Sequence, residues 1–139
     1  MKTKVCFLID DDEDDREIFS LALEKATNSY SCITASSGPD ALALLNADAP
    51  FTPDIIFLDL NMPLMPGKEC LQHIKNNTKL ANIPVIIYTT SSYSKDIDDT
   101  RSLGASHFLV KPPGLGILTR ALKRLLSGEE LPYFIDHSS

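Results

Sequence analysis

Residues 54–67 of this 139-residue chain read DIIFLDLNMPLMPG. The apolar run 55–58 is continuous rather than alternating, which is typical of a strand buried on both faces of a parallel sheet. Asp59 follows this run directly, and the two prolines and the glycine of 63–67 indicate a loop. The stretch therefore predicts a central strand that ends in a carboxylate.

Similar apolar runs occur on both sides of this stretch, at 5–9, 84–88 and 107–110, and a weaker run at 31–35 suits an edge strand. Helical patterns lie between the runs, with shared faces at Ile18, Leu21, Ala22 and Lys25, at Ala41, Leu42, Leu44 and Leu45, and at Leu115, Leu118, Leu122, Leu125 and Leu126. Five strands alternating with five helices predict a doubly wound α/β sheet.

The composition bounds the class of protein. The length fits one domain, with 43% apolar and 23% charged residues. A formal net charge of −6 argues against nucleic acid and anionic lipid as direct ligands. The three cysteines lack metal-ligand spacing, and the first apolar run is too short for a signal peptide or a membrane span. We therefore expect a cytoplasmic protein with reduced thiols, among which Cys6 and Cys32 fill core positions.

We expect a main domain over residues 1–128 and a short C-terminal tail over 129–139. The tail is too short to form an output domain, yet its segment LPYFI (131–135) is unusually apolar. We expect this segment to pack on its own domain or on a neighbouring molecule, with partner docking as the alternative.

Polar side chains follow four of the predicted strands. Asp10 and Asp11 come after the first strand, Asp59 after the third, Thr89 after the fourth and Lys111 after the fifth. Ligands of an open parallel sheet bind beyond the carboxyl ends of its strands, so these side chains should meet at one edge. Each residue alone has an ordinary structural explanation, and only their joint placement predicts a site.

The electrostatics of such a site favour a divalent cation. Two carboxylates about 4 Å apart repel by about 4 kcal/mol at an effective dielectric near 20, equal to roughly 3 pKa units. Lys111 cannot neutralise three acids, whereas Lys111 together with Mg²⁺ brings the formal sum to zero. Oxygen ligands with room for water suit Mg²⁺. A phosphoryl group on Asp59 would leave a sum of about −1, and a carboxylate can act as the nucleophile toward phosphorus.

Four segments carry a family resemblance: FLIDDDEDD (7–15), DIIFLDLNMPLMPG (54–67), PVIIYTTSS (84–92) and GASHFLVKP (104–112). Together they resemble the receiver domain of bacterial two-component response regulators, and the single-domain, chemotaxis-regulator-like members in particular. The resemblance covers about residues 4–127. It implies a flavodoxin-like, five-stranded parallel sheet with strand order 2-1-3-4-5.

The resemblance also implies a role for each matching residue. Asp59 matches the phosphoacceptor, Asp10 and Asp11 the acidic pair that binds Mg²⁺, Asn61 a metal ligand through its backbone carbonyl, Thr89 the switch hydroxyl, Lys111 the phosphoryl-binding lysine and Phe108 the switch aromatic. Asp11 with Asp12 is an alternative acidic pair, and Thr90 is an alternative to Thr89. The resemblance further implies a cis peptide bond between Lys111 and Pro112.

The function implied is that of a stand-alone response regulator. It would take phosphoryl from a histidine kinase or a phosphotransfer protein, lose it slowly and signal to an unknown downstream protein, without acting as an enzyme on other substrates. Phosphorylation would draw Thr89 toward the phosphoryl group and Phe108 inward, reshaping the face of the fourth helix, fifth strand and last helix. The small side chains of Asn61 and Ser91 suggest no special protection of the phosphoryl group.

Two other functions compete with this hypothesis. A pseudo-receiver would bind partners without phosphorylation, but the set of expected residues is complete. A Mg²⁺-dependent hydrolase resembling the haloacid dehalogenases would need a second acid two residues after the nucleophile, where this chain has Asn61.

Overall fold

The computed structural model describes residues 3–47 and 51–136. In chain order its elements are β1 (Lys4–Ile9), α1 (Glu13–Ala26), β2 (Tyr30–Ala35), α2 (Gly38–Leu45), β3 (Ile55–Leu58), α3 (Gly67–Asn76), β4 (Val85–Thr89), α4 (Ser94–Ser102), β5 (His107–Val110), α5 (Leu115–Leu126) and β6 (Phe134–Ile135). Strands and helices alternate through α5, as the sequence predicts.

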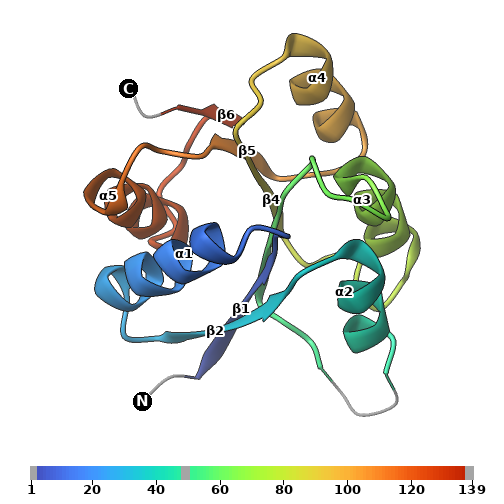
Figure 1. The fold of residues 1–139 in the computed structure, drawn as a ribbon, viewed down its shortest axis with the longest axis horizontal. Coiled ribbons are helices and arrows are strands. Elements are labelled where there is room, and N and C mark those ends of the chain that lie inside the picture. Colours follow the sequence, from blue (N-terminus) through green and yellow to red (C-terminus); the bar gives the residue numbers. More distant parts are fainter. Residues whose placement is uncertain (1–2, 48–50, 137–139) are drawn as a thin grey trace.

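The strands form one parallel sheet in the order β2-β1-β3-β4-β5-β6 (Figure 1). The predicted order of the first five strands is confirmed. Strand β1 lies at the point where the order reverses, with Ile9 opposite Ala35 of β2 on one side and opposite Leu58 of β3 on the other. This reversal opens a crevice beyond the carboxyl ends of β1 and β3.

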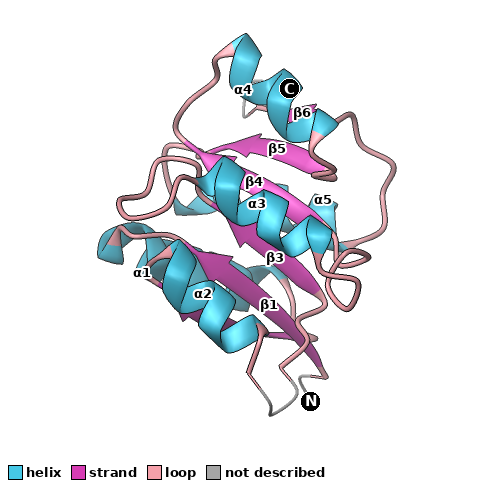
Figure 2. Ribbon diagram, turned by 90° about the vertical axis from the view of Figure 1, so that its right-hand side faces the viewer, coloured by secondary structure: helices cyan, strands magenta, loops and turns pink. Residues whose placement is uncertain are grey.

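Helices cover both faces of the sheet, with α1 and α5 on one side and α2, α3 and α4 on the other (Figures 1 and 2). Side chains of β1 alternate between the two cores. Phe7 and Ile9 belong to the core under α2 and α3, whereas Cys6 and Leu8 belong to the core under α1 and α5. Burial on both faces explains why the strand sequences read as continuous apolar runs.

The predicted helix after β1 is confirmed, but only Ala22 of the predicted apolar face is buried. Phe19, Ala22 and Leu23 are buried, whereas Ile18 and Leu21 remain 43% and 47% exposed. One residue corresponds to about 100° around a helix. Turning the aromatic ring of Phe19 into the core removes more apolar surface from water than turning Ile18 inward would.

The sixth strand corrects the prediction of a five-stranded sheet. Phe134 and Ile135 of β6 pair with Phe108 and Leu109 of β5, so the apolar part of the tail extends the sheet. The expectation that this segment packs on its own domain is confirmed. A strand of two residues is too short for a periodicity pattern to reveal. The described part of the tail ends at residue 136.

Two further expectations concern single features. Cys6 is buried in the core as predicted, but Cys32 is only half-buried because β2 is an edge strand. Within the described ranges, none of the helices combines the length and the apolar character that a bilayer crossing requires.

Candidate functional site

The turn after β1 brings the first carboxylate into the site. The backbone N–H of Asp10 donates to the carbonyl of Ala35 at 3.0 Å, so strand pairing continues up to the functional residue. The Asp10 side chain is fully buried, and its Oδ1 accepts the backbone N–H of Asp12 at 3.0 Å. Burial raises the pKa of Asp10; hydrogen bonds from Lys111 and Asp12 oppose this, and the negative charge of Asp59 adds to it.

The start of α1 shows which two acids of the run 10–15 enter the site. Asp12 is the N-cap of this helix, and its carboxylate accepts the backbone N–H of Asp15 at 3.0 Å. Asp10 and Asp11 instead lie near Asp59. The structure therefore brings together the pair Asp10 and Asp11, and uses Asp12 as a helix cap.

Asp59 lies at the carboxyl end of β3. Its backbone N–H donates to the carbonyl of Ile9 at 3.0 Å, and its Oδ1 accepts the backbone N–H of Asn61 at 3.3 Å. The start of α3 closes over this turn, with the N–H of Gly67 donating to the carbonyl of Leu60 at 2.9 Å. A Cβ at Gly67 would lie 2.3 Å from the carbonyl oxygen of Asp59, so only glycine allows this approach.

Three carboxylates lie close enough together to hold one cation between them. One oxygen each of Asp10, Asp11 and Asp59 lie within 4.8 Å of one another. Oxygen ligands around Mg²⁺ sit at about 2.0–2.1 Å from the ion, so adjacent ligands are about 3 Å apart. The Asp10 Oδ2 atom is buried, and the Lys111 ammonium lies 2.8 Å from it. This donor set fits a hard divalent cation.

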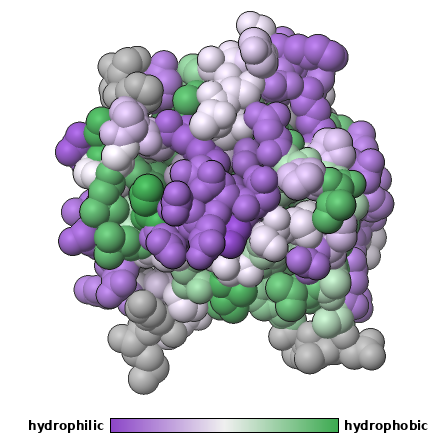
Figure 3. Space-filling model, in the orientation of Figure 1, coloured by the Kyte–Doolittle hydropathy of each residue, from purple (hydrophilic) through white to green (hydrophobic). Residues whose placement is uncertain are grey.

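The cluster opens to solvent through a cavity of about 550 Å³. Its lining residues are Asp11, Asp12, Glu13, Asp14, Asp15, Asp59, Asn61, Thr90 and Lys111. Figure 3 shows a hydrophilic patch on this face of the molecule, over the carboxyl end of β1. A small polar group can therefore reach Asp59 from solvent.

Lys111 joins the acids from the end of β5. Its ammonium nitrogen lies 2.8 Å from Asp10 Oδ2, 2.7 Å from Asp15 Oδ2 and 3.5 Å from Asp59 Oδ2, and its side chain is only 9% exposed. Burial acts to lower the pKa of Lys111, but hydrogen bonds to Asp10 and Asp15 and the charge of Asp59 raise the pKa above its ordinary value. The lysine is therefore held as a cation.

Sequence reasoning missed the contact between Lys111 and Asp15, two residues 96 positions apart. Asp15 belongs to an acidic run whose members all suit the first turn of a helix. No signal in the sequence sets Asp15 apart from its neighbours in this run, because any of them could serve the start of the helix at Glu13.

Two hydroxyl groups follow β4. Thr89 is fully buried, and its Oγ1 accepts a long hydrogen bond of 3.5 Å from the side-chain amide of Asn61. Thr90 is exposed and lies on the wall of the cavity. The buried Thr89 is thus already connected to the loop that carries the phosphoacceptor candidate.

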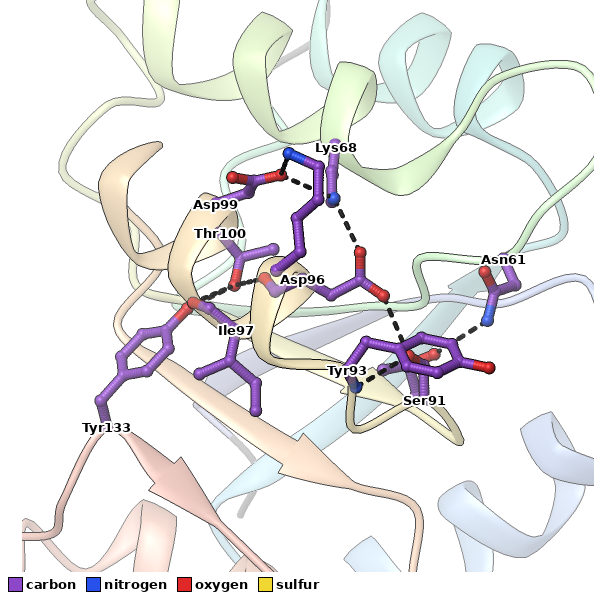
Figure 4. A network of polar contacts seen from close by, with 11 residues as sticks. Asn61, Lys68, Ser91, Tyr93, Asp96, Ile97, Asp99, Thr100 and Tyr133 are labelled. Carbon is purple, nitrogen blue, oxygen red and sulfur yellow. Dashed lines mark hydrogen bonds and ion pairs between the residues drawn. The ribbon is translucent and has the colours of Figure 1, made fainter.

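A polar network continues from the loop after β4 into α4 (Figure 4). The Ser91 hydroxyl donates to Asp96 Oδ2 at 2.9 Å, and Lys68 of α3 bridges Asp96 at 2.7 Å and Asp99 at 2.9 Å. Because Lys68 follows Gly67, this network connects the two loops that border Asp59.

Phe108 is fully buried, and its neighbours come from the tail. Its ring lies 5.9 Å from the ring of Phe134, and its backbone N–H donates to the carbonyl of Tyr133 at 2.8 Å. The Tyr133 hydroxyl shares a hydrogen bond of 2.7 Å with Thr100 of α4. In this structure β6 covers the ring of Phe108, and the movement of this ring on phosphorylation stays a prediction.

The predicted cis peptide bond between Lys111 and Pro112 is wrong. Every peptide bond in the described residues is trans. Trans is the favoured form of such bonds by about 0.5–1 kcal/mol. The chain changes direction instead at Gly114, which has a φ of 127° and donates its N–H to the carbonyl of Pro112 at 3.0 Å.

Comparisons with known proteins agree with this geometry. The sequence profile of the response regulator receiver domain matches residues 6–123. Response regulator Rcp1 of Synechocystis sp. is 30% identical over 128 residues, covering 89% of this chain and 87% of Rcp1. The crystal structure of Mn²⁺-bound Rcp1 has a TM-score of 0.81 at 30% identity, covering 94% of this chain and 99% of that one. The phosphorylated cyanobacterial phytochrome response regulator RcpA has a TM-score of 0.82 at 33% identity, with coverages of 93% and 98%.

Proposed function

This chain belongs to the response regulator receiver domain family, and we propose that it works as a stand-alone response regulator that accepts a phosphoryl group on Asp59. The observation that carries the proposal is the position of the Lys111 ammonium between Asp10 and Asp59, beside three carboxylates within reach of one cation. Opposite charges around a carboxylate that lines a cavity open to solvent favour the transfer of an anionic group to that carboxylate.

The reaction follows from the groups around Asp59. A carboxylate oxygen of Asp59 attacks the phosphorus of a phosphohistidine, an O–P bond forms, and the P–N bond breaks with its electron pair going to the imidazole nitrogen. Lys111 donates to one phosphoryl oxygen, the backbone N–H of Asn61 is within reach of a second, and the hydroxyl of Thr89 approaches from β4. The product is an acyl phosphate on Asp59.

Mg²⁺ is the proposed cofactor. Asp10, Asp11, Asp59 and the backbone carbonyl of Asn61 would hold it, and all of these donors are oxygen atoms. When bound, the ion offsets the negative charge that gathers at the transferring group. Two relatives support the proposal, since Rcp1 was solved with Mn²⁺ bound and RcpA in its phosphorylated form.

The proposed partners are a histidine kinase or phosphotransfer protein as donor and a downstream protein as receiver of the signal. Receiver function is assigned to residues 1–128, with the tail from residue 129 as an addition. The residue at position 61 argues against a hydrolase, because the Asn61 amide donates to Thr89 and cannot exchange a proton as a carboxyl group would. Signalling rather than substrate turnover is the function that the residues support.

Intact-mass spectrometry after incubation with acetyl phosphate and Mg²⁺ tests the proposal. We expect one added phosphoryl group on the wild type, none on Asp59→Asn, and none when a chelator removes the metal. Asp54→Asn is the matched control, because Asp54 lies next to the opposite end of β3, where it accepts the N–H of Val5. An unmodified wild type, or equal labelling of Asp59→Asn, would overturn the proposed function.

A further inference from the structure

Asp15 makes the shortest contact to the Lys111 ammonium. Its Oδ2 lies 2.7 Å from Lys111 Nζ, compared with 2.8 Å for Asp10 and 3.5 Å for Asp59. Its side chain is 34% exposed, whereas those of Asp10 and Asp59 are nearly inaccessible. None of the roles proposed above for the receiver site belongs to Asp15.

The start of α1 explains why this carboxylate is available. Asp15 is the third residue of the helix, where an acidic side chain commonly turns back to the backbone N–H of the N-cap. In this chain the N–H of the N-cap, Asp12, donates instead to Asp10. The Asp15 carboxylate is thereby released from capping and reaches across the site to Lys111.

The contact places Asp15 in competition with a group on Asp59. Asp10 and Asp15 lie at hydrogen-bonding distance from the ammonium nitrogen and hold it 3.5 Å from Asp59, which is too far for a good hydrogen bond. A phosphoryl group on Asp59 would need the same ammonium. It would also raise the negative charge of a site that already contains Asp10 and Asp11.

We infer that Asp15 is a positioning residue that holds the Lys111 ammonium away from Asp59 and competes with the phosphoryl group for it. Asp15 therefore lowers the affinity of the site for phosphoryl and sets how readily the phosphorylated state forms. The inference rests on the proposed function, since it concerns a group bound at Asp59.

The test compares Asp15→Asn with Asp14→Asn and Asp15→Glu. Asp14 is exposed, lies in the same first turn of α1 and carries the same charge, but makes no ion pair with Lys111 in the described structure. The affinity for beryllofluoride with Mg²⁺, a non-covalent mimic of the phosphoryl group, is the first measurement. The second, made without metal, is the ¹⁵N signal of the Lys111 ammonium in each variant.

We expect Asp15→Asn to bind beryllofluoride about fivefold more tightly, a factor in keeping with the loss of one partly exposed ion pair. Asp14→Asn should change the affinity by less than about twofold. Asp15→Glu, which keeps the negative charge, should bind about as tightly as the wild type. The Lys111 signal should shift in Asp15→Asn and stay in place in Asp14→Asn. Urea unfolding of each variant separates these effects from a change in stability.

Equal tightening in Asp15→Asn and Asp14→Asn would overturn the inference, because it would reflect net charge alone. Weaker binding in Asp15→Asn would also overturn it, by showing that Asp15 supports the lysine instead of competing for it. Binding of beryllofluoride to the wild type tests the proposed phosphoacceptor site. The ratio of affinities between the variants and the wild type tests the role of Asp15, so a failure of one proposal is distinguished from a failure of the other.

Discussion

Two lysines in this molecule each bridge aspartates at the carboxyl edge of the sheet, and they differ mainly in burial. Lys111 contacts Asp10 and Asp15 with a side chain that is 9% exposed. Lys68 contacts Asp96 and Asp99 at similar distances of 2.7 and 2.9 Å, but its side chain is 31% exposed (Figure 4). Distance alone would not distinguish the two clusters.

Burial gives the clusters different consequences. Around Lys111 the acids outnumber the cation, and Asp10 and Asp59 are almost inaccessible to water, so the excess negative charge favours a divalent cation. Around Lys68 water screens the charges, and Lys95 adds a second cation 3.1 Å from Asp99. The first cluster is suited to chemistry, whereas the second joins α3 to α4 and positions the loops beside Asp59.

The largest expected effect is that of Lys111→Met in the absence of metal. Removal of the ammonium leaves the buried Asp10 without its ion pair, which we expect to cost about 3–4 kcal/mol of the free energy of unfolding at pH 7. This cost has an upper limit, because Asp10 can take up a proton instead of staying charged. Protonation costs about 1.4 kcal/mol for each unit by which the pH exceeds the ordinary pKa of Asp10. Urea unfolding of both proteins at pH 7 and pH 5 measures it.

The pH dependence follows from the raised pKa of Asp10. A folded-state pKa above the unfolded value favours the native state at low pH and loses this contribution as the pH rises. The raised pKa should rise further in Lys111→Met, so the difference between the wild type and this variant should shrink as the pH falls from 7 to 5. A cost below about 1 kcal/mol at pH 7 would contradict the claim that burial separates the two clusters.

Gly67→Ala should have the next largest effect, because this residue lies between the clusters. The new Cβ would be 2.3 Å from the carbonyl oxygen of Asp59 and 2.6 Å from the Cα of Leu60, and backbone cannot move aside as a side chain can. We expect a loss of about 1–3 kcal/mol in the free energy of unfolding, together with slower phosphorylation of Asp59. Urea unfolding and the labelling rate from acetyl phosphate are the two measurements.

Gly116→Ala is the matched control, since nothing lies within 4 Å of a Cβ there. Inside α5 this substitution should stabilise the protein slightly through helix propensity. Unchanged stability and labelling in Gly67→Ala would mean that the start of α3 does not depend on close contact with the turn after β3.

The two clusters also show what sequence reasoning can reach. The convergence of Asp10, Asp59 and Lys111 could be predicted because parallel strands place their carboxyl ends at one edge, whereas the strand order followed from the family resemblance. The contact of Asp15 could not, since a residue in an acidic helix start has several equivalent local explanations. The direction of a side chain in the first turn of a helix depends on which backbone N–H groups already have hydrogen-bond partners. Those partners are known only once the fold of the turn is known.

The C-terminal tail is the second region whose structure the sequence did not predict. The run LPYFI was recognised as apolar, but its pairing with β5 depends on the backbone edge that β5 leaves open, which a pattern of two residues does not indicate. The contact of Phe108 with Phe134 follows from that pairing, so the sequence could not indicate it either.

Asp96→Asn should have a smaller effect, of about 1 kcal/mol at pH 7, since the pair it breaks is partly exposed. The hydrogen bond from Lys68 lowers the pKa of Asp96 below its ordinary value of 3.8; burial opposes this, and the hydrogen bond from Ser91 assists it. A lowered pKa contributes stability above the ordinary value and loses it as the pH falls through the folded-state value. The difference from the wild type in urea unfolding should therefore persist at pH 5 and fade only below about pH 4, in contrast to Lys111→Met. Fading already between pH 7 and pH 5 would contradict the assignment.

Salt should have the smallest effect and the clearest contrast. The screening length falls from about 10 Å at 0.1 M to about 3 Å at 1 M salt, and it acts on charges that water reaches. The destabilisation caused by Lys68→Met, expected to be at most about 1 kcal/mol, should fall by a few tenths of a kcal/mol over this range. The destabilisation caused by Lys111→Met should stay constant, because its ion pair with Asp10 is enclosed by protein. Parallel urea titrations at the two salt concentrations measure both differences. Equal salt dependence would place the two lysines in the same electrostatic environment. Burial could then no longer explain why acids outnumber cations around Lys111 but not around Lys68.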